Sequence, residues 1–104
     1  MKKYAAVDIG SNAIRLLIVG VLKTNSVHKY RKISLVRVPI RLGQDVFLYK
    51  KISNKKLKLL LNTLKAFKLL MSVHNIDRYK ICATSAMRES KNSKEVLKRV
   101  RKKL

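Results

Sequence analysis

The spacing of hydrophobic and polar positions changes about a third of the way along the chain and predicts strands first, helices afterwards. Up to Val38 the apolar residues form short runs or alternate with polar ones, as they do in strands. We therefore predict three strands, Tyr4–Ile9, Ile14–Leu22 and Val27–Val38, the first of them buried on both faces. Because short turns join them, they should form an antiparallel meander with a tight hairpin turn at residues 10–13.

A proline then ends the third strand, since it cannot donate to a strand ladder. The next segment, Arg41–Lys51, is predicted to be a loop with Gly43 as its flexible point. From there the apolar spacing becomes helical, and Ser53 or Asn54 can cap the start of a helix that ends near Asn75. The stripe that this helix should bury consists of Leu57, Leu60, Leu61, Leu64, Phe67 and Met71.

The last part of the chain is predicted to return to the sheet. Tyr79–Ala83 is typical of a strand parallel to the first one, because a long helix is the usual crossover between parallel strands. Helical structure should begin at Ser85–Glu89, and Ser93 can cap a final helix. The apolar stripe of that helix is Val96, Leu97, Val100 and Leu104. The predicted order is βββαβα, an α/β fold with a mixed sheet.

Composition limits the chain to one modest core and makes it strongly basic. It has 104 residues, 26 Lys and Arg against five acids, and a formal net charge of +21. Polyphosphate, nucleic acid or an anionic membrane surface would relieve this self-repulsion, although scattered lysines are also typical of an ordinary solvated surface. The single cysteine, Cys82, excludes an internal disulfide and favours a reducing compartment, so we expect a cytoplasmic protein. Ile14–Leu22 is too short to span a membrane, and Asp8 interrupts the apolar run that a signal peptide needs.

An acid inside an apolar strand is the first candidate for chemistry. Asp8 comes at the end of the first strand, directly before a turn that contains Gly10, Ser11 and Asn12. Such a turn presents several backbone N–H groups to an anion, and the two polar side chains add donors. Asp8 can hold a hydrated Mg²⁺ that bridges to phosphate oxygens. The alternative is an ordinary hairpin with a solvent-facing aspartate.

Two further groups of residues are placed to join this turn. Arg15 lies inside an apolar strand, where its charge needs a fixed partner such as a phosphate. Thr84, Ser85 and Arg88 lie where the fourth strand ends and a helix begins, and helix starts attract anions. The alternative is a capping hydroxyl with Arg88 paired to a nearby glutamate. Since both clusters end strands that should be neighbours, we expect them to meet in one crevice.

The other polar residues are given ordinary roles. His28 and His74 are expected at the surface, and Cys82 is expected to be a small buried hydrophobe. A further set flanks the predicted loop and is either solvated or in contact with an elongated substrate: Arg37, Arg41 and Asp45.

Three blocks of sequence in this order, AAVDIGSNAIRLLI, VPIRLGQDVF and ATSAMRESKN, resemble the exopolyphosphatase and guanosine pentaphosphate phosphatase (Ppx/GppA) family. The resemblance implies the N-terminal lobe of the actin-like, ribonuclease H-like ATPase fold, which opens with βββαβα. It further implies Mg²⁺-assisted hydrolysis of a terminal phosphoanhydride, from polyphosphate or from a guanosine penta- or tetraphosphate.

On this chain the resemblance matches Asp8–Asn12 to the family's first phosphate loop, Arg15 to a phosphate-contacting arginine, and Thr84–Arg88 to a block beside the cleft. The family takes its catalytic glutamate from a segment just after the position of Leu104, and its second phosphate loop lies further on. We therefore expect residues 1–104 to form one partial domain, from a fragment or a truncated product. Turnover by this chain alone is not expected, although a homodimer or a complementing second chain would change that.

The alternative from another class is a non-enzymatic module that holds RNA, DNA or polyphosphate through phosphate groups alone. A protein that binds single-stranded nucleic acid is expected to have clustered aromatic residues, and this chain has only six, which do not cluster in the sequence. A fragment of an actin-like kinase or ATPase is a third hypothesis, disfavoured by the ATSAMRES block.

Overall fold

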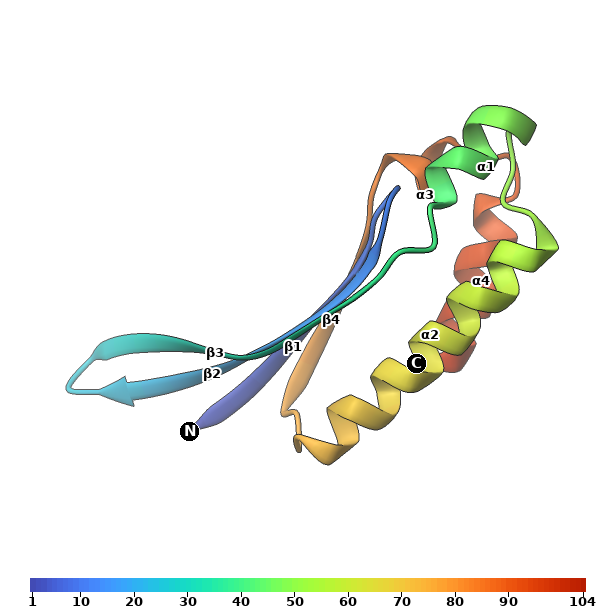
Figure 1. The fold of residues 1–104 in the computed structure, drawn as a ribbon. Coiled ribbons are helices and arrows are strands. Elements are labelled where there is room, and N and C mark those ends of the chain that lie inside the picture. The colour runs from blue at the N-terminus through green and yellow to red at the C-terminus, as the bar shows by residue number, and fades with distance from the viewer.

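A computed structural model describes residues 1–104, apart from the side chain of Ser85. Three strands come first and are followed by two helices, a fourth strand and two more helices, and Figure 1 shows their arrangement. In chain order the elements are β1 (Lys2–Ile9), β2 (Ile14–Thr24), β3 (Val27–Val38), α1 (Leu42–Tyr49), α2 (Asn54–Val73), β4 (Arg78–Ala83), α3 (Ser85–Glu89) and α4 (Ser93–Lys103).

The four strands form one mixed sheet in the order β3-β2-β1-β4. β1 pairs with β2 and β2 with β3 in antiparallel fashion, whereas β4 lies parallel to β1. The predicted meander and the predicted parallel return strand are therefore confirmed. The helix α2 makes the crossover between β3 and β4, because a parallel neighbour cannot be reached by a tight turn.

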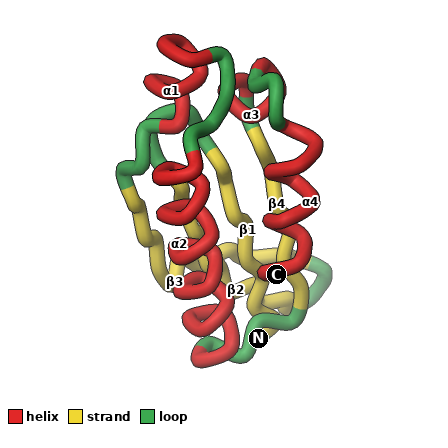
Figure 2. The backbone as a smooth tube through the Cα atoms, turned by 90° about the vertical axis from the view of Figure 1, so that its right-hand side faces the viewer, coloured by secondary structure: helices red, strands yellow, loops and turns green.

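The long helices cover one face of this sheet and leave the other open, as Figures 1 and 2 show from two directions. Along β1, Ala5, Val7 and Ile9 are buried, and the residues between them, such as Ala6 and Asp8, are only half-buried. The prediction that this strand is buried on both faces is wrong, because α2 and α4 pack on the same side. For the same reason Cys82 is exposed on the open face and is not the small buried hydrophobe we expected.

The predicted stripe of α2 is confirmed as the centre of the core: all six of its residues are buried. Its N-cap is Ser53, whose hydroxyl accepts a hydrogen bond from the Lys56 N–H at 3.2 Å. Asn75 follows the helix with a φ of 54°, the left-handed conformation that terminates helices. Among the described residues, no helix is both long enough and apolar enough to cross a membrane.

The segment predicted to be a loop at Arg41–Lys51 contains a helix instead. Leu42 and Val46 are one helical turn apart and both are buried, so α1 has a narrow apolar face. Exposed apolar residues after Val46 blur this spacing in the sequence, namely Phe47, Leu48 and Tyr49. The observed order is therefore βββααβαα.

The last helix, α4, is confirmed with a correction at its start. Its N-cap is Asn92, not Ser93, and the Asn92 side chain makes no cap hydrogen bond because it is bound elsewhere. Val96 and Val100 are buried as predicted, while the other two residues of the stripe, Leu97 and Leu104, are half-buried against the core.

The hairpin of β2 and β3 extends well past the end of β1, at the left of Figure 1. It makes the molecule elongated, with principal extents of 52 × 22 × 21 Å. The register of the two strands shifts by one residue between Ile18 and Val19. This bulge re-aims the outer part of the hairpin, since an extra residue bends a strand and increases its twist.

Candidate functional site

The turn between β1 and β2 is tight, as the sequence predicts. The Gly10 N–H donates a hydrogen bond to the Ala13 carbonyl at 3.0 Å, which closes the turn directly after Ile9. A Cβ on Gly10 would lie 2.9 Å from that carbonyl oxygen, so any other residue would push the turn open. Glycine is needed here for a close approach within the turn itself.

Helix α1 holds the turn in place through backbone hydrogen bonds. The Gly43 N–H donates to the Ser11 carbonyl and the Arg41 N–H donates to the Asn12 carbonyl, each at 2.9 Å. Arg41 has a φ of 60°, an uncommon value for a residue with a side chain. Such strain persists only where neighbours fix the backbone. Here the Lys56 ammonium donates to the Arg41 carbonyl at 3.1 Å and to the Ile40 carbonyl at 2.6 Å.

These bonds use the carbonyl groups of the turn and leave its donors available. Within the part of the chain that the structure describes, the N–H groups of Ser11, Asn12 and Ala13 donate no hydrogen bond. Unpaired N–H groups at a turn form a concavity that attracts an anion. The turn is therefore a candidate anion site, and α1 holds it through its carbonyl groups.

Charged residues lie in one row across the open face beside this turn. The strand register places Asp8 opposite Arg15, and Arg15 opposite Arg37 on β3. Asp8 is half-buried and both arginines are exposed, so the expectation that Arg15 needs a fixed partner inside an apolar strand is wrong: its side chain is on the open face. In the described part of the chain the one ion pair joins Lys56 and Asp45, so neither arginine is neutralised by a carboxylate.

The second predicted cluster lies directly beside the first. The end of β4 is paired with the end of β1, and the Thr84 N–H and hydroxyl both donate to the Ile9 carbonyl, at 3.1 and 3.2 Å. In this structure the Thr84 hydroxyl is thus used to join the two strand ends. Arg88 is exposed on α3, and the Ser85 side chain lies outside the described residues. Apart from Ser85, the site residues predicted from the sequence are brought to one end of the sheet.

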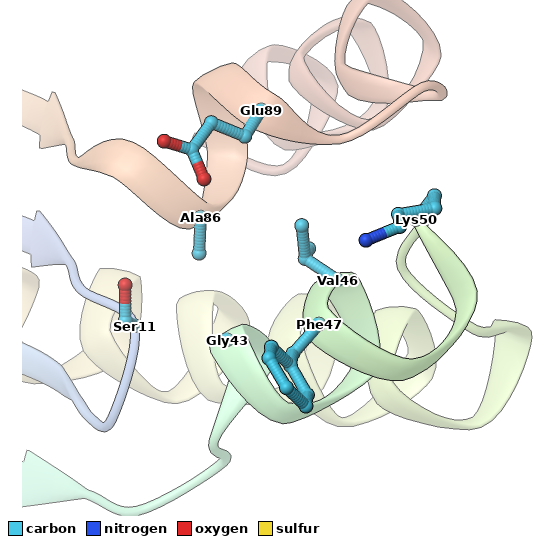
Figure 3. A pocket seen from close by; sticks show the side chains of 7 residues that line it. All are labelled: Ser11, Gly43, Val46, Phe47, Lys50, Ala86 and Glu89. Carbon is cyan, nitrogen blue, oxygen red and sulfur yellow. The ribbon is translucent and has the colours of Figure 1, made fainter.

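A hollow of about 460 Å³ opens between this turn, α1 and α3. Figure 3 shows Ser11, Ala86 and the Glu89 carboxylate on one side of it, facing Gly43 and the exposed ring of Phe47 across the opening. A second hollow, of about 760 Å³, is lined by Asn12, Arg37, Pro39, Arg41, Gly43 and Gln44. Gly43 borders both hollows, so the start of α1 forms the wall between them.

The loop residues singled out in the sequence divide into two groups. Arg37 and Arg41 border the second hollow, whereas Asp45 is buried and accepts a hydrogen bond from the Ser53 N–H at 2.9 Å. Asp45 therefore fixes the start of α2, and the prediction that it lies in a solvated loop is wrong. Gly43 and Lys56 support the turn, and the sequence does not predict this because their partners are distant in sequence.

Asp8 is the candidate for metal binding. No group of three or more His, Cys, Asp or Glu side chains in the described residues is placed to hold a metal ion. A single carboxylate still fits Mg²⁺, which keeps several waters and is commonly held by one or two carboxylates together with substrate phosphates.

Known proteins are similar to this chain in sequence and in fold. The model of the Ppx/GppA phosphatase family matches residues 21–104. The chain belongs to the Ppx/GppA phosphatase family. The matched residues include α1, the support of the turn, and the ATSAMRESKN block at β4 and α3.

Solved Ppx/GppA structures have the same fold over nearly all of this chain. The type II variant of the Aquifex aeolicus Ppx/GppA phosphatase is 29% identical, with a TM-score of 0.88 over 99% of this chain and 33% of that one. An exopolyphosphatase from Cytophaga hutchinsonii is 22% identical, with a TM-score of 0.86 over 98% of this chain and 31% of that one. These matches confirm the predicted fold class, α/β of the actin-like ATPase type.

One relative is similar to this chain in sequence. It is the bifunctional 3-dehydroquinate synthase/phosphatase of Fusobacterium nucleatum subsp. nucleatum, 33% identical over an alignment of 99 residues that covers 92% of this chain and 15% of that protein. The chain thus spans about a third of the solved relatives and a smaller share of the curated one.

Proposed function

We propose that this chain supplies the first phosphate-binding half of an exopolyphosphatase-like hydrolase. Its substrate class would be a chain of phosphoanhydrides with a free end, either polyphosphate or a guanosine penta- or tetraphosphate. The observation that carries the proposal is the anion-binding turn at Ser11 and Asn12, with its N–H groups free and its carbonyls held by α1.

In this proposal the terminal phosphate sits against the turn. The N–H groups of Ser11, Asn12 and Ala13 hold its oxygens, and the Arg15 guanidinium donates two parallel hydrogen bonds to it. Arg88, exposed at the neighbouring strand end, approaches from the other side. Positioning and charge neutralisation of this kind supply most of the catalysis in phosphoryl transfer.

Asp8 would hold Mg²⁺ through its hydration shell, and the ion would neutralise phosphate charge. For residues 1–104 alone we predict binding without meaningful turnover, because the resemblance assigns water activation to a glutamate outside these residues. A cytoplasmic location and a homodimer or complementing second chain likewise remain predictions.

The test compares arginines of the site with a cation elsewhere. Arg15→Ala and Arg88→Ala should each weaken binding of long-chain polyphosphate, measured by titration calorimetry with Mg²⁺, because a charge-assisted hydrogen bond is lost. Lys65→Ala is the matched control, since this exposed lysine on α2 loses the same charge. Equal losses in all three variants would contradict the proposal in favour of a diffuse electrostatic surface. Robust phosphate release by the unmodified chain in a malachite-green assay would contradict the prediction of no turnover.

A further inference from the structure

The open face of the sheet carries a groove at the end opposite to the phosphate turn. It has a volume of about 530 Å³ and lies where the hairpin of β2 and β3 extends past β1. Its lining residues are Lys2, Tyr4, Val19, Val21, Lys23, His28 and Tyr30. Val21 is six residues along β2 from Arg15, which separates the groove from the phosphate turn by about 20 Å at the rise of a strand.

Strand register brings together aromatic residues that are distant in the sequence. One cross-strand row runs from Lys2 through Val21 to Tyr30, and the next runs from Tyr4 through Val19 to Lys32. Tyr4 is half-buried, whereas Tyr30 is 73% exposed, so its ring is open to solvent. The aromatic residues do not cluster in the sequence, yet these two tyrosines line one groove in the fold.

The chemistry of this groove combines three features. Val19 and Val21 on β2 form an apolar floor between Tyr4 on β1 and Tyr30 on β3, and Lys2 and Lys23 also line the groove. None of the lining residues is acidic. Planar rings beside cations, on an open four-stranded sheet, are the means by which known RNA-binding sheets stack bases and hold the phosphates between them.

We propose that this groove binds single-stranded nucleic acid, with a base stacked on Tyr30 and the adjacent phosphates held by Lys2 and Lys23. A base offers a flat apolar surface to the rings and the valine floor, and its backbone offers the negative charge that the lysines complement. Inorganic polyphosphate has the charge without the bases, so it would leave the aromatic part of the groove unused. The site is independent of the phosphate turn and of the function proposed for it.

The experiment measures fluorescence anisotropy with two labelled probes of equal charge. One is an oligothymidylate of about 15 nucleotides, which covers the usual site sizes of such proteins. The other is an abasic oligonucleotide of the same length, which has the phosphates and lacks the bases. We expect the oligothymidylate to bind at least about fivefold more tightly, as the stacking of one base requires. Equal binding of both probes, or no binding of either, would overturn the proposal.

Variants then locate the effect. Tyr30→Ala should abolish the preference for the probe with bases, and Tyr30→Phe should keep it because the ring remains. Tyr49→Ala is the matched control, since Tyr49 is a similarly exposed tyrosine, on α1. Lys23→Ala should weaken both probes alike. A preference that survives in Tyr30→Ala would overturn the assignment, as would a dimer of the chain, seen by sedimentation, that excludes the probe from this face.

Discussion

Asn92 joins two parts of the chain that border the candidate site, and its removal is a quantitative test of the structure. Its side-chain amide donates to the Ile52 carbonyl at 2.9 Å, and its oxygen accepts from the Ile52 N–H at 3.0 Å. The Ser90 hydroxyl donates to the same oxygen. Asn92 thus links the connection between α1 and α2 to the connection between α3 and α4.

The expected effect of Asn92→Ala follows from these bonds. Three partly buried hydrogen bonds are lost, two to Ile52 and one from the Ser90 hydroxyl. The N–H and carbonyl of Ile52 are left without their partner, and unsatisfied buried groups cost about 1–3 kcal/mol each. Because these groups are only partly buried, we expect the lower part of that sum, a fall in the free energy of unfolding of roughly 2–4 kcal/mol. For a domain of this size the midpoint of thermal unfolding should then fall by roughly 10–25 °C.

Urea and thermal unfolding followed by far-UV circular dichroism measure this loss. Asn62→Ala is the matched control, because Asn62 is exposed on α2 and its removal should change stability by less than about 0.5 kcal/mol. Asn92→Asp keeps the acceptor for the Ile52 N–H and loses the donor, so it should lie between the two. If Asn92→Ala were as stable as Asn62→Ala, the link between the two connections would be refuted.

Two further substitutions test the supports of the phosphate turn. Gly43→Ala places a Cβ 3.0 Å from the Ser11 Cβ, so it should weaken polyphosphate binding while unfolding shows no loss of stability, since Ala favours a helix by up to about 1 kcal/mol. Leu48→Ala is its control, since Leu48 is exposed on α1 and lines neither hollow, and equal polyphosphate affinity in both variants would show that the turn does not depend on α1. Thr84→Val should lower stability by about 1 kcal/mol through the lost bond to Ile9. Its polyphosphate affinity should change less than twofold, and a larger loss would show that the hydroxyl reaches the phosphate.

The elements that the sequence predicted correctly have signals within one segment. The stripe of α2 repeats over several turns, and each strand of the meander lies between turn residues, so local spacing was sufficient. The helix α1 has only Leu42 and Val46 as its apolar face, and the exposed Phe47 beside them hides the spacing. Short helices of this kind depend on tertiary contacts for their stability, and those contacts cannot be read from a window of sequence.

In the candidate site, too, some residues could be identified from neighbouring sequence and others could not. Gly10, Ser11 and Asn12 were recognisable because a turn and its donors are neighbours in sequence. Their support by Arg41 and Gly43 was not, because hydrogen bonds across about 30 positions leave no periodic trace. The groove at Tyr30 is still harder to predict from sequence, because the register of three strands brings its lining residues together.

The five acids of this basic chain differ in what their carboxylates contact, and this difference helps to decide whether Asp8 is placed for a ligand. Asp45 accepts from the Ser53 N–H and Asp77 from the Lys3 N–H, so both carboxylates fix backbone groups. Asp8 and Glu89 instead lie at the candidate site, without an ion-pair partner among the described residues. Glu95, exposed on α4, has no ion-pair partner among the described residues either, so the lack of an ion pair does not by itself mark a site. What favours the interpretation of Asp8 as a residue placed for a ligand is its position directly before the turn whose N–H groups are unpaired.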